Sequence, residues 1–175
     1  MSADYAMSRL RRIAESHRFF FITTHFRSNA LPLEEEEQDI VLQSIRESPE
    51  QRHFLLIAYC IMPTHLHILL APHDNDTMRN IMRDIKLRSS KRVSAKRGHP
   101  CKLWQARSFD RIMRHRQELS ETIEYIHLNP VRDGLVKDPF AWKRSSARAY
   151  LRTETAAVPI DFVDLPIDGR TPLRW

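Results

Sequence analysis

Two histidines one residue apart, His65 and His67, lie in a segment that is otherwise mostly apolar, residues 59–72. In an extended strand alternate side chains point to opposite faces, so both imidazoles share one face while Leu66 points to a core. Two neighbouring imidazoles on one face can bind a single divalent cation. A His-x-His pair is a weak signal by itself, because half-buried surface histidines give the same pattern.

A phenol and an amide form a second pair further along the chain. Residues 117–129 have helical periodicity, and Tyr125 and Asn129 within them are one turn apart, so their side chains share a face. Each also has an ordinary interpretation. A lone tyrosine on a helix usually packs its ring and exposes its hydroxyl. An asparagine before Pro130 often ends a helix, because proline disfavours a helical residue before it. We expect this step to disturb the helix of residues 117–129, and Gly134 is a natural C-terminal stop.

Basic residues are concentrated in one part of the chain. The whole chain has a net charge of +6, whereas residues 79–116 alone carry +11, with 13 Lys or Arg against two acids. A solvated helix face usually mixes both signs, while a surface that replaces counterions along a phosphate backbone is basic. This segment therefore predicts a nucleic-acid-binding surface. The candidates for phosphate contacts are the basic side chains of its helix: Arg83, Lys86, Arg88, Lys91, Arg92, Lys96 and Arg97.

The elements that position these residues follow from hydrophobic periodicity and turn signals. Strands are expected at residues 18–26, 53–61, 65–71 and 103–113, and helices at residues 33–45, 77–96 and 117–129. This order is the split βαβ arrangement of ferredoxin-like α+β folds. Such folds have a four-stranded antiparallel sheet with both intervening helices on one face. The histidines then belong on the other face or at its edge, where the helix after the last strand can approach.

Length and composition suggest one domain and a tail. A chain of 175 residues that is 42% hydrophobic suits one domain, expected at residues 1–151, followed by an extended, proline-containing tail at residues 152–175. The tail could complete the core as a strap, or lie beside the basic surface and compete with DNA. Two isolated cysteines fit a reducing cytosol, and no apolar run is long enough to cross a membrane. We expect a cytoplasmic monomer or homodimer without membrane contact.

Three sequence blocks together resemble a known family. They are Met-Pro-Thr-His-Leu-His at residues 62–67, Tyr-Ile-His-Leu-Asn-Pro-Val-Arg-Asp-Gly-Leu-Val at residues 125–136, and Trp-Lys-Arg-Ser-Ser at residues 142–146. Blocks of this kind in this order are similar to those of REP-associated tyrosine transposases, single-tyrosine HUH nucleases related to small insertion-sequence transposases. That family favours Trp-Ser-Ser in the last block, so this chain departs from it by Lys143 and Arg144.

The resemblance implies an activity, a metal and a set of site residues. It implies the HUH nuclease form of the split βαβ fold and metal-dependent cleavage and rejoining of single-stranded hairpin DNA. Tyr125 would be the nucleophile and form a covalent 5′-phosphotyrosine intermediate. His65, His67 and Asn129 would hold Mg²⁺ or Mn²⁺, which acts as a Lewis acid on the phosphate.

Two other functions are compatible with the residues. A non-catalytic nucleic-acid-binding module would place stacking aromatics at the centre of the open sheet face, where this chain has histidines. Trp104 and Phe109 could stack bases, although core packing explains each equally well. A zinc hydrolase is a weaker alternative, because two histidines with one amide lack the usual carboxylate or thiolate. The remaining histidines are expected to be structural or at the surface, with His25 as the one to compare with the site.

Overall fold

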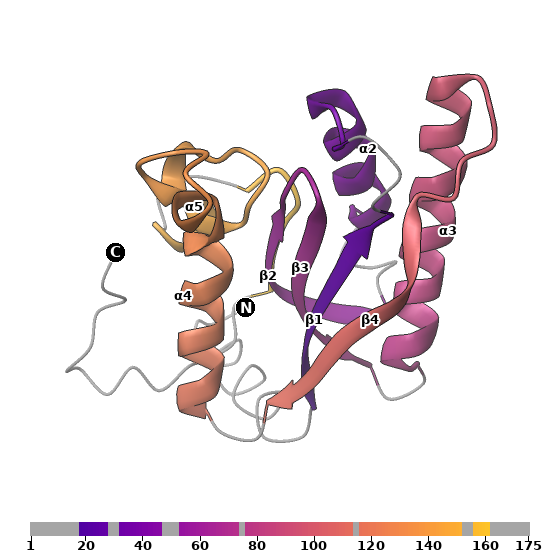
Figure 1. Ribbon diagram of the computed structural model, residues 1–175. Coiled ribbons are helices and arrows are strands. Elements are labelled where there is room, and N and C mark those ends of the chain that lie inside the picture. Colours follow the sequence, from indigo (N-terminus) through magenta and orange to yellow (C-terminus); the bar gives the residue numbers. More distant parts are fainter. Residues whose placement is uncertain are drawn as a thin grey trace, which may run out of the picture.

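The computed structural model describes residues 18–27, 32–46, 53–73, 76–113, 116–151 and 156–161. Its elements in chain order are β1 (Phe19–Phe26), α2 (Glu35–Ile45), β2 (Phe54–Ile61), β3 (His65–Pro72), α3 (Met78–Arg97), β4 (Trp104–Met113), α4 (Arg116–Arg132), the 3-10 helix η1 (Pro139–Ala141) and α5 (Ala147–Tyr150). From β1 to α4 this is the predicted order (Figure 1). Within the described residues no helix is long and apolar enough to span a membrane.

The four strands form one antiparallel sheet in the order β2-β3-β1-β4. Strands β3 and β1 therefore lie in the centre, and β4 forms an edge. Thr23 of β1 lies opposite His67 on β3 and opposite Phe109 on β4. Directly opposed residues project to the same face of a sheet, so these three side chains lie in a row across three strands.

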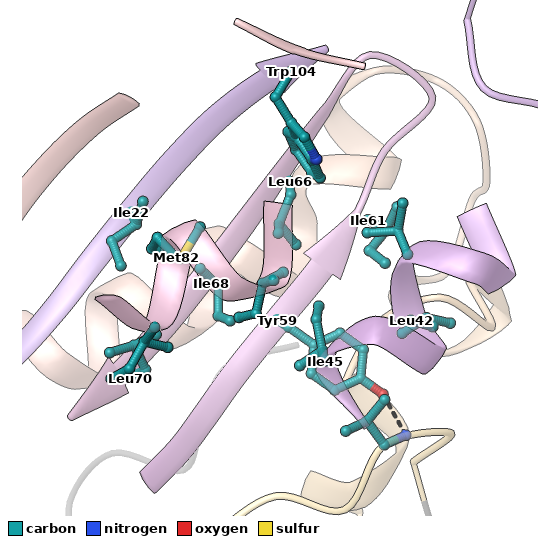
Figure 2. Packing of buried hydrophobic residues seen from close by; sticks show 14 of the residues in the cluster. Ile22, Leu42, Ile45, Tyr59, Ile61, Leu66, Ile68, Leu70, Met82 and Trp104 are labelled. Carbon is teal, nitrogen blue, oxygen red and sulfur yellow. Dashed lines mark hydrogen bonds between the residues drawn. The ribbon is translucent and has the colours of Figure 1, made fainter. Parts of the chain in front are cut away.

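Helices lie on both faces of the sheet, with α2 and α3 on one face and α4 on the other (Figure 1). The larger core lies between the sheet and the first two helices, and its members include Ile22, Leu66, Ile68, Leu70 and Met82 (Figure 2). A smaller core on the second face joins Leu69 and Ala71 of β3 to Ile123 and Ile126 of α4. The predicted ferredoxin-like α+β fold is confirmed, including the histidines on the face that the last helix approaches.

The predicted end of α4 at Asn129 is wrong, because the helix continues through Pro130 to Arg132. A proline so near the end of a helix removes only one backbone donor from the ladder. The predicted stop at Gly134 is confirmed, because this glycine has φ 70° and follows the helix by two residues. The Gly134 N–H donates to the carbonyl of Val131 at 3.0 Å, and the N–H of the next residue donates to the carbonyl of Pro130 at 2.9 Å. This is the Schellman arrangement, in which glycine is favoured at the left-handed position.

Residues 156–161 lie along the outer edge of β2. The Val158 N–H donates to the hydroxyl of Tyr59 at 3.0 Å, the bond drawn in Figure 2. The Asp161 N–H donates to the carbonyl of Leu56 at 2.7 Å, and the Asp161 carboxylate accepts the Leu56 N–H at 2.9 Å. This part of the tail therefore acts as a strap on the sheet edge. Residues 162–175 lie outside the described part of the chain.

Candidate active site

His65 and His67 project from β3 onto the sheet face that α4 approaches. Their Nε2 atoms are 2.9 Å apart. The hydroxyl of Thr64 lies 2.9 Å from Nδ1 of His65, and that of Thr23 lies 2.9 Å from Nδ1 of His67. Each ring thus has its Nδ1 held by a hydroxyl and its Nε2 directed at the other ring.

This arrangement of the two imidazoles fits a shared divalent cation. When Nδ1–H donates to a hydroxyl, Nε2 keeps its lone pair for a metal. Two nitrogens each about 2.1 Å from an ion, in directions at right angles, are about 3 Å apart, close to the observed separation. Burial is the main cause that lowers the pKa of both rings, that of His67 to about 3. Both shifts favour the neutral imidazole, the form that metal binding requires.

Asn129 reaches the histidines from α4. Its side chain is buried, and its Nδ2 donates to the carbonyl of Tyr125 at 2.8 Å. Because a carbonyl only accepts, the Oδ1 atom is left for another partner. A side-chain hydrogen bond with Asn129 acts to raise the pKa of His67, against the effect of burial, so the amide lies beside that imidazole.

Tyr125 lies next to the same pair and remains accessible. Its ring meets that of His67 edge-on, with centroids 5.5 Å apart, and the residue is 39% exposed. The structure therefore brings together all four residues predicted for the site, one phenol, two imidazoles and one amide. No group of three or more His, Cys, Asp or Glu side chains suited to a metal ion occurs in the described ranges. The predicted ligands His65, His67 and Asn129 do not form such a group, because the third of them is an amide.

Sequence reasoning missed several residues that support this site. The guanidinium of Arg132 lies over the Tyr125 ring, with Cζ 5.0 Å from the ring centroid. Phe21 stacks on His67, with centroids 5.6 Å apart, and meets Tyr125 edge-on at 5.9 Å. Thr23 was also missed. If the helix had been predicted to continue past Pro130, Arg132 would have been placed two turns from Tyr125 and on the same face of the helix.

Two further histidines differ in their relation to the site. His25 is exposed at the end of β1, with its ring 5.2 Å from that of His65, and its charge contributes to lowering the pKa of His65. His127 is fully buried on another face of α4, where its Nε2 lies 2.8 Å from the hydroxyl of Ser146. The structural role predicted for His127 is confirmed.

The two aromatics that could stack bases have different positions. Trp104 is buried in the larger core (Figure 2). Its indole N–H donates to the Ser89 hydroxyl at 2.9 Å. Phe109, in contrast, is 61% exposed. Core packing therefore explains Trp104, and only Phe109 is available to a ligand.

Comparison with known proteins identifies the family. Residues 16–129 match the family described as IS200-like transposases. The chain belongs to this family. It is 26% identical over 144 residues to the REP-associated tyrosine transposase of Escherichia coli K12, covering 80% of this chain and 82% of that protein. The resemblance deduced from the sequence is thus confirmed, and the chain is a transposase-family enzyme that acts on DNA.

A solved structure supports the fold of this transposase. It is that of a REP-associated tyrosine transposase bound to a REP hairpin, with a TM-score of 0.67 and 21% identity. The match covers 90% of this chain and 84% of that chain. At this identity the likeness shows the fold. The four predicted site residues all lie within the stretch that matches the family model.

Residues 142–146, where this transposase departs from the expected Trp-Ser-Ser, are hydrogen-bonded to β2. The indole N–H of Trp142 donates to the carbonyl of Ile61 at 2.9 Å, and Ser146 Oγ accepts the N–H of Tyr59 at 3.0 Å. The additional residue Arg144 reaches α2, where its Nε donates to Asp39 at 2.9 Å. In this chain the Trp and the second Ser of the block thus both bond to β2, while Arg144 links the block to α2.

The basic side chains of α3 lie on the opposite face of the transposase sheet from the histidines. Lys96 and Arg97 form ion pairs with α2, Lys96 with Glu36 and Arg97 with Glu37. The second Arg97 bond, from Nη2 to the Glu37 carboxylate, is 2.8 Å long, and Arg97 is the first cause of a lowered pKa at Glu37. The charges of these two candidates are thus already balanced within the protein.

The other candidates on α3 have mixed surroundings. Lys86 donates to the Ser108 hydroxyl at 2.8 Å, and Arg83 pairs with Asp84 at 3.1 Å. Lys91 and Arg92 are exposed, and Arg88 is half-buried. The structure does not bring this helix to the tyrosine site, and DNA contact by its basic residues stays a prediction.

Proposed function

We propose that this transposase cleaves and rejoins single-stranded, hairpin-forming repeat DNA through a covalent 5′-phosphotyrosine at Tyr125. The observation that carries the proposal is the convergence of two elements. Strand β3 presents a neutral imidazole pair, and α4 places an accessible phenol and a buried amide directly beside it. A nucleophile next to a set of metal ligands is what phosphodiester cleavage requires.

The reaction exchanges one phosphorus–oxygen bond for another, so the energy of the phosphodiester bond is conserved. The oxygen of Tyr125 loses its proton and attacks phosphorus, the bond from phosphorus to the 3′ oxygen breaks, and that oxygen takes up a proton. The products are a 5′-phosphotyrosine and a free 3′-OH. Attack of a 3′-OH on the phosphotyrosine reverses these steps and releases the tyrosine, so rejoining needs no nucleotide cofactor.

The site residues have separate tasks in this scheme. His65, His67 and the Oδ1 of Asn129 would hold Mg²⁺ or Mn²⁺, which when bound neutralises charge on the phosphoryl oxygens as a Lewis acid. The threonine hydroxyls occupy Nδ1 of both imidazoles and orient the rings with Nε2 towards the site. Arg132, over the Tyr125 ring, places a positive charge beside the phenol, where negative charge develops as the phenol loses its proton and again when the tyrosine leaves during rejoining.

A denaturing gel tests the proposal. Wild-type protein is incubated with single-stranded hairpin DNA and Mg²⁺ or Mn²⁺. DNA labelled at its 3′ end should migrate as a denaturation-resistant protein adduct, and DNA labelled at its 5′ end should be released with an extendable 3′-OH. Tyr125→Phe should bind the hairpin without forming the adduct, whereas Tyr5→Phe serves as the matched control. A normal adduct from Tyr125→Phe would overturn the assignment of the nucleophile.

The same gel separates the enzyme from a non-catalytic binding module. If the wild type binds hairpin DNA tightly and yields neither adduct nor cleaved strand with either metal, the binding module is correct. An exposed aromatic such as Phe109 is compatible with both functions, so DNA affinity alone does not decide between them.

A further inference from the structure

Phe109 is the most exposed large hydrophobic side chain in the described part of the chain, at 61%. It lies in the middle of β4, where every residue between the two buried ends is exposed except the half-buried Ser108. Among the described residues no ring packs against it. A phenyl ring left in water forgoes the free energy of burial, and Phe109 belongs to neither of the two hydrophobic clusters of the described residues. Core packing therefore does not explain its position, and a ligand would.

The position of Phe109 links it to the proposed site. On the neighbouring strand β1, Thr23 lies opposite Phe109. The hydroxyl of the same Thr23 is hydrogen-bonded to Nδ1 of His67 on β3. Phe109 is thus in the same row as His67 and on the same sheet face, two strand spacings away, which is about 10 Å. A DNA strand covers that distance in about three nucleotides of B-form rise, and in fewer when extended.

The charge around the ring suits a DNA strand. Arg111 follows Phe109 on the same face of β4 and is opposite Phe21, the residue that stacks on His67. Its side chain is 57% exposed, although one nitrogen pairs with Glu118 at 3.2 Å. Arg132 lies on the other side of the row, over Tyr125. One guanidinium is thus near the Phe109 end of the row and the other is near the His67 end. Together with the exposed ring they provide both parts of a single-strand site, a stacking surface and cations for the phosphates.

We propose that Phe109 is a stacking platform for an unpaired nucleobase of the DNA strand whose phosphate lies at the imidazole pair. This inference rests on the proposed function, because it takes the phosphate position from that site. Stacking on phenylalanine accepts every base, since each has a π face. The platform therefore positions the strand for cleavage and adds little sequence discrimination of its own.

The experiment is a double-mutant cycle between protein and DNA. The probes are labelled hairpins with unpaired tails, in which one tail nucleotide after another is replaced by an abasic unit. For the wild type, one abasic position should weaken binding by about fivefold to a hundredfold, the range expected when one base stack is removed. Phe109→Ala should weaken binding of the intact hairpin by the same factor and show no further loss at that abasic position.

Matched variants separate stacking from other effects of the change. Phe109→Trp should keep the affinity, and Phe109→Leu, which is apolar without a π face, should lose most of it. Ile112→Ala is the control, because Ile112 lies on the same strand, is 42% exposed and points to the opposite face. Cleavage under single-turnover conditions should fall in parallel for Phe109→Ala, because the strand is less well positioned.

The outcomes distinguish this inference from the proposed function. If the wild type forms the tyrosine adduct and Phe109→Ala binds and cleaves every hairpin as the wild type does, the stacking platform is wrong while the enzyme stands. The platform would also be wrong if Phe109→Ala and the abasic position each weaken binding and their losses add when the two changes are combined. If the wild type forms no adduct but the cycle still shows coupling, the stacking site exists and the proposed chemistry is wrong.

Discussion

The hydroxyl of Thr23 lies 2.9 Å from Nδ1 of His67, across the pairing of β1 with β3. This contact occupies Nδ1, so Nε2 is the nitrogen that faces His65. A residue on the central strand β1 thereby orients the imidazole of a residue on the neighbouring strand β3. The register of the sheet is for this reason part of the active site.

The first prediction follows from that contact. Thr23→Val removes the hydroxyl and leaves a side chain of similar size, so Nδ1 of His67 loses its hydrogen-bond partner and the ring is less well oriented for metal binding. We expect the Mn²⁺ concentration needed for half-maximal cleavage to rise about 10- to 100-fold, and Thr23→Ser to restore it. The measurement is a metal titration of cleavage rate at fixed DNA.

The neighbouring residue provides the control for this change. Thr24 is fully buried on the opposite face of β1, and within the described residues its hydroxyl has no hydrogen-bond partner. Thr24→Val should therefore leave the metal titration unchanged and stability equal or greater, because no hydrogen bond is broken. An identical metal dependence for Thr23→Val and the wild type would exclude a role of this hydroxyl in the site.

The second prediction concerns the metal ligands. EDTA should stop cleavage by the wild type, and added Mn²⁺ should restore it. His67→Ala removes a central ligand and should abolish cleavage at any metal concentration. Asn129→Ala removes the weaker amide ligand and should raise the required Mn²⁺ concentration by at least about tenfold. Full activity of the wild type in EDTA would refute a metal mechanism, and circular dichroism checks that each variant is folded.

Much of this architecture could be predicted because its signals are local. Alternating apolar residues and turn signals located the strands of the sheet, and the histidine motif was visible within one strand. The role of Thr23 was not visible, because it depends on how two strands far apart in sequence align. Arg132 was missed for a different reason. The helix was expected to stop before Pro130, although a proline in the last turn removes only one backbone donor.

The third prediction concerns the basic residues of α3. The exposed pair Lys91 and Arg92 should contribute to DNA affinity without regard to sequence, so the double change to Glu should weaken binding and flatten its salt dependence. The slope of log affinity against log salt should fall by about one for each phosphate that the protein no longer neutralises. Binding measured at several salt concentrations checks this, and an unchanged affinity and slope would remove α3 from the DNA surface.

Arg97 on the same helix gives the contrast. Its guanidinium is bound to the buried Glu37, whose side chain is 4% exposed. Arg97→Ala should therefore lower the free energy of unfolding, since it leaves a buried carboxylate without its partner. The salt slope of DNA binding should not change. A reduced slope for Arg97→Ala without loss of stability would show that this arginine contacts DNA after all.

The last prediction concerns the pH dependence of stability. Burial lowers the pKa of His127 to about 3, whereas an unfolded histidine titrates near about 6.5. Between these values the unfolded chain binds a proton that the folded chain does not. The contribution of the neutral ring is therefore complete above about pH 6.5 and is lost as the pH falls towards the folded pKa. The loss is about 1.4 kcal/mol per pH unit.

Urea unfolding of the wild type and His127→Gln at a series of pH values measures this effect. Glutamine can still hydrogen-bond to Ser146, which His127 contacts at 2.8 Å, and it does not titrate. The variant should be less stable at neutral pH, and the gap should narrow as the pH falls, because only the wild type loses the His127 contribution. The imidazoles of the site remain in both proteins, so their effect cancels. A gap that stays constant from neutral to acidic pH would show that His127 takes up its proton in the folded protein as readily as in the unfolded chain.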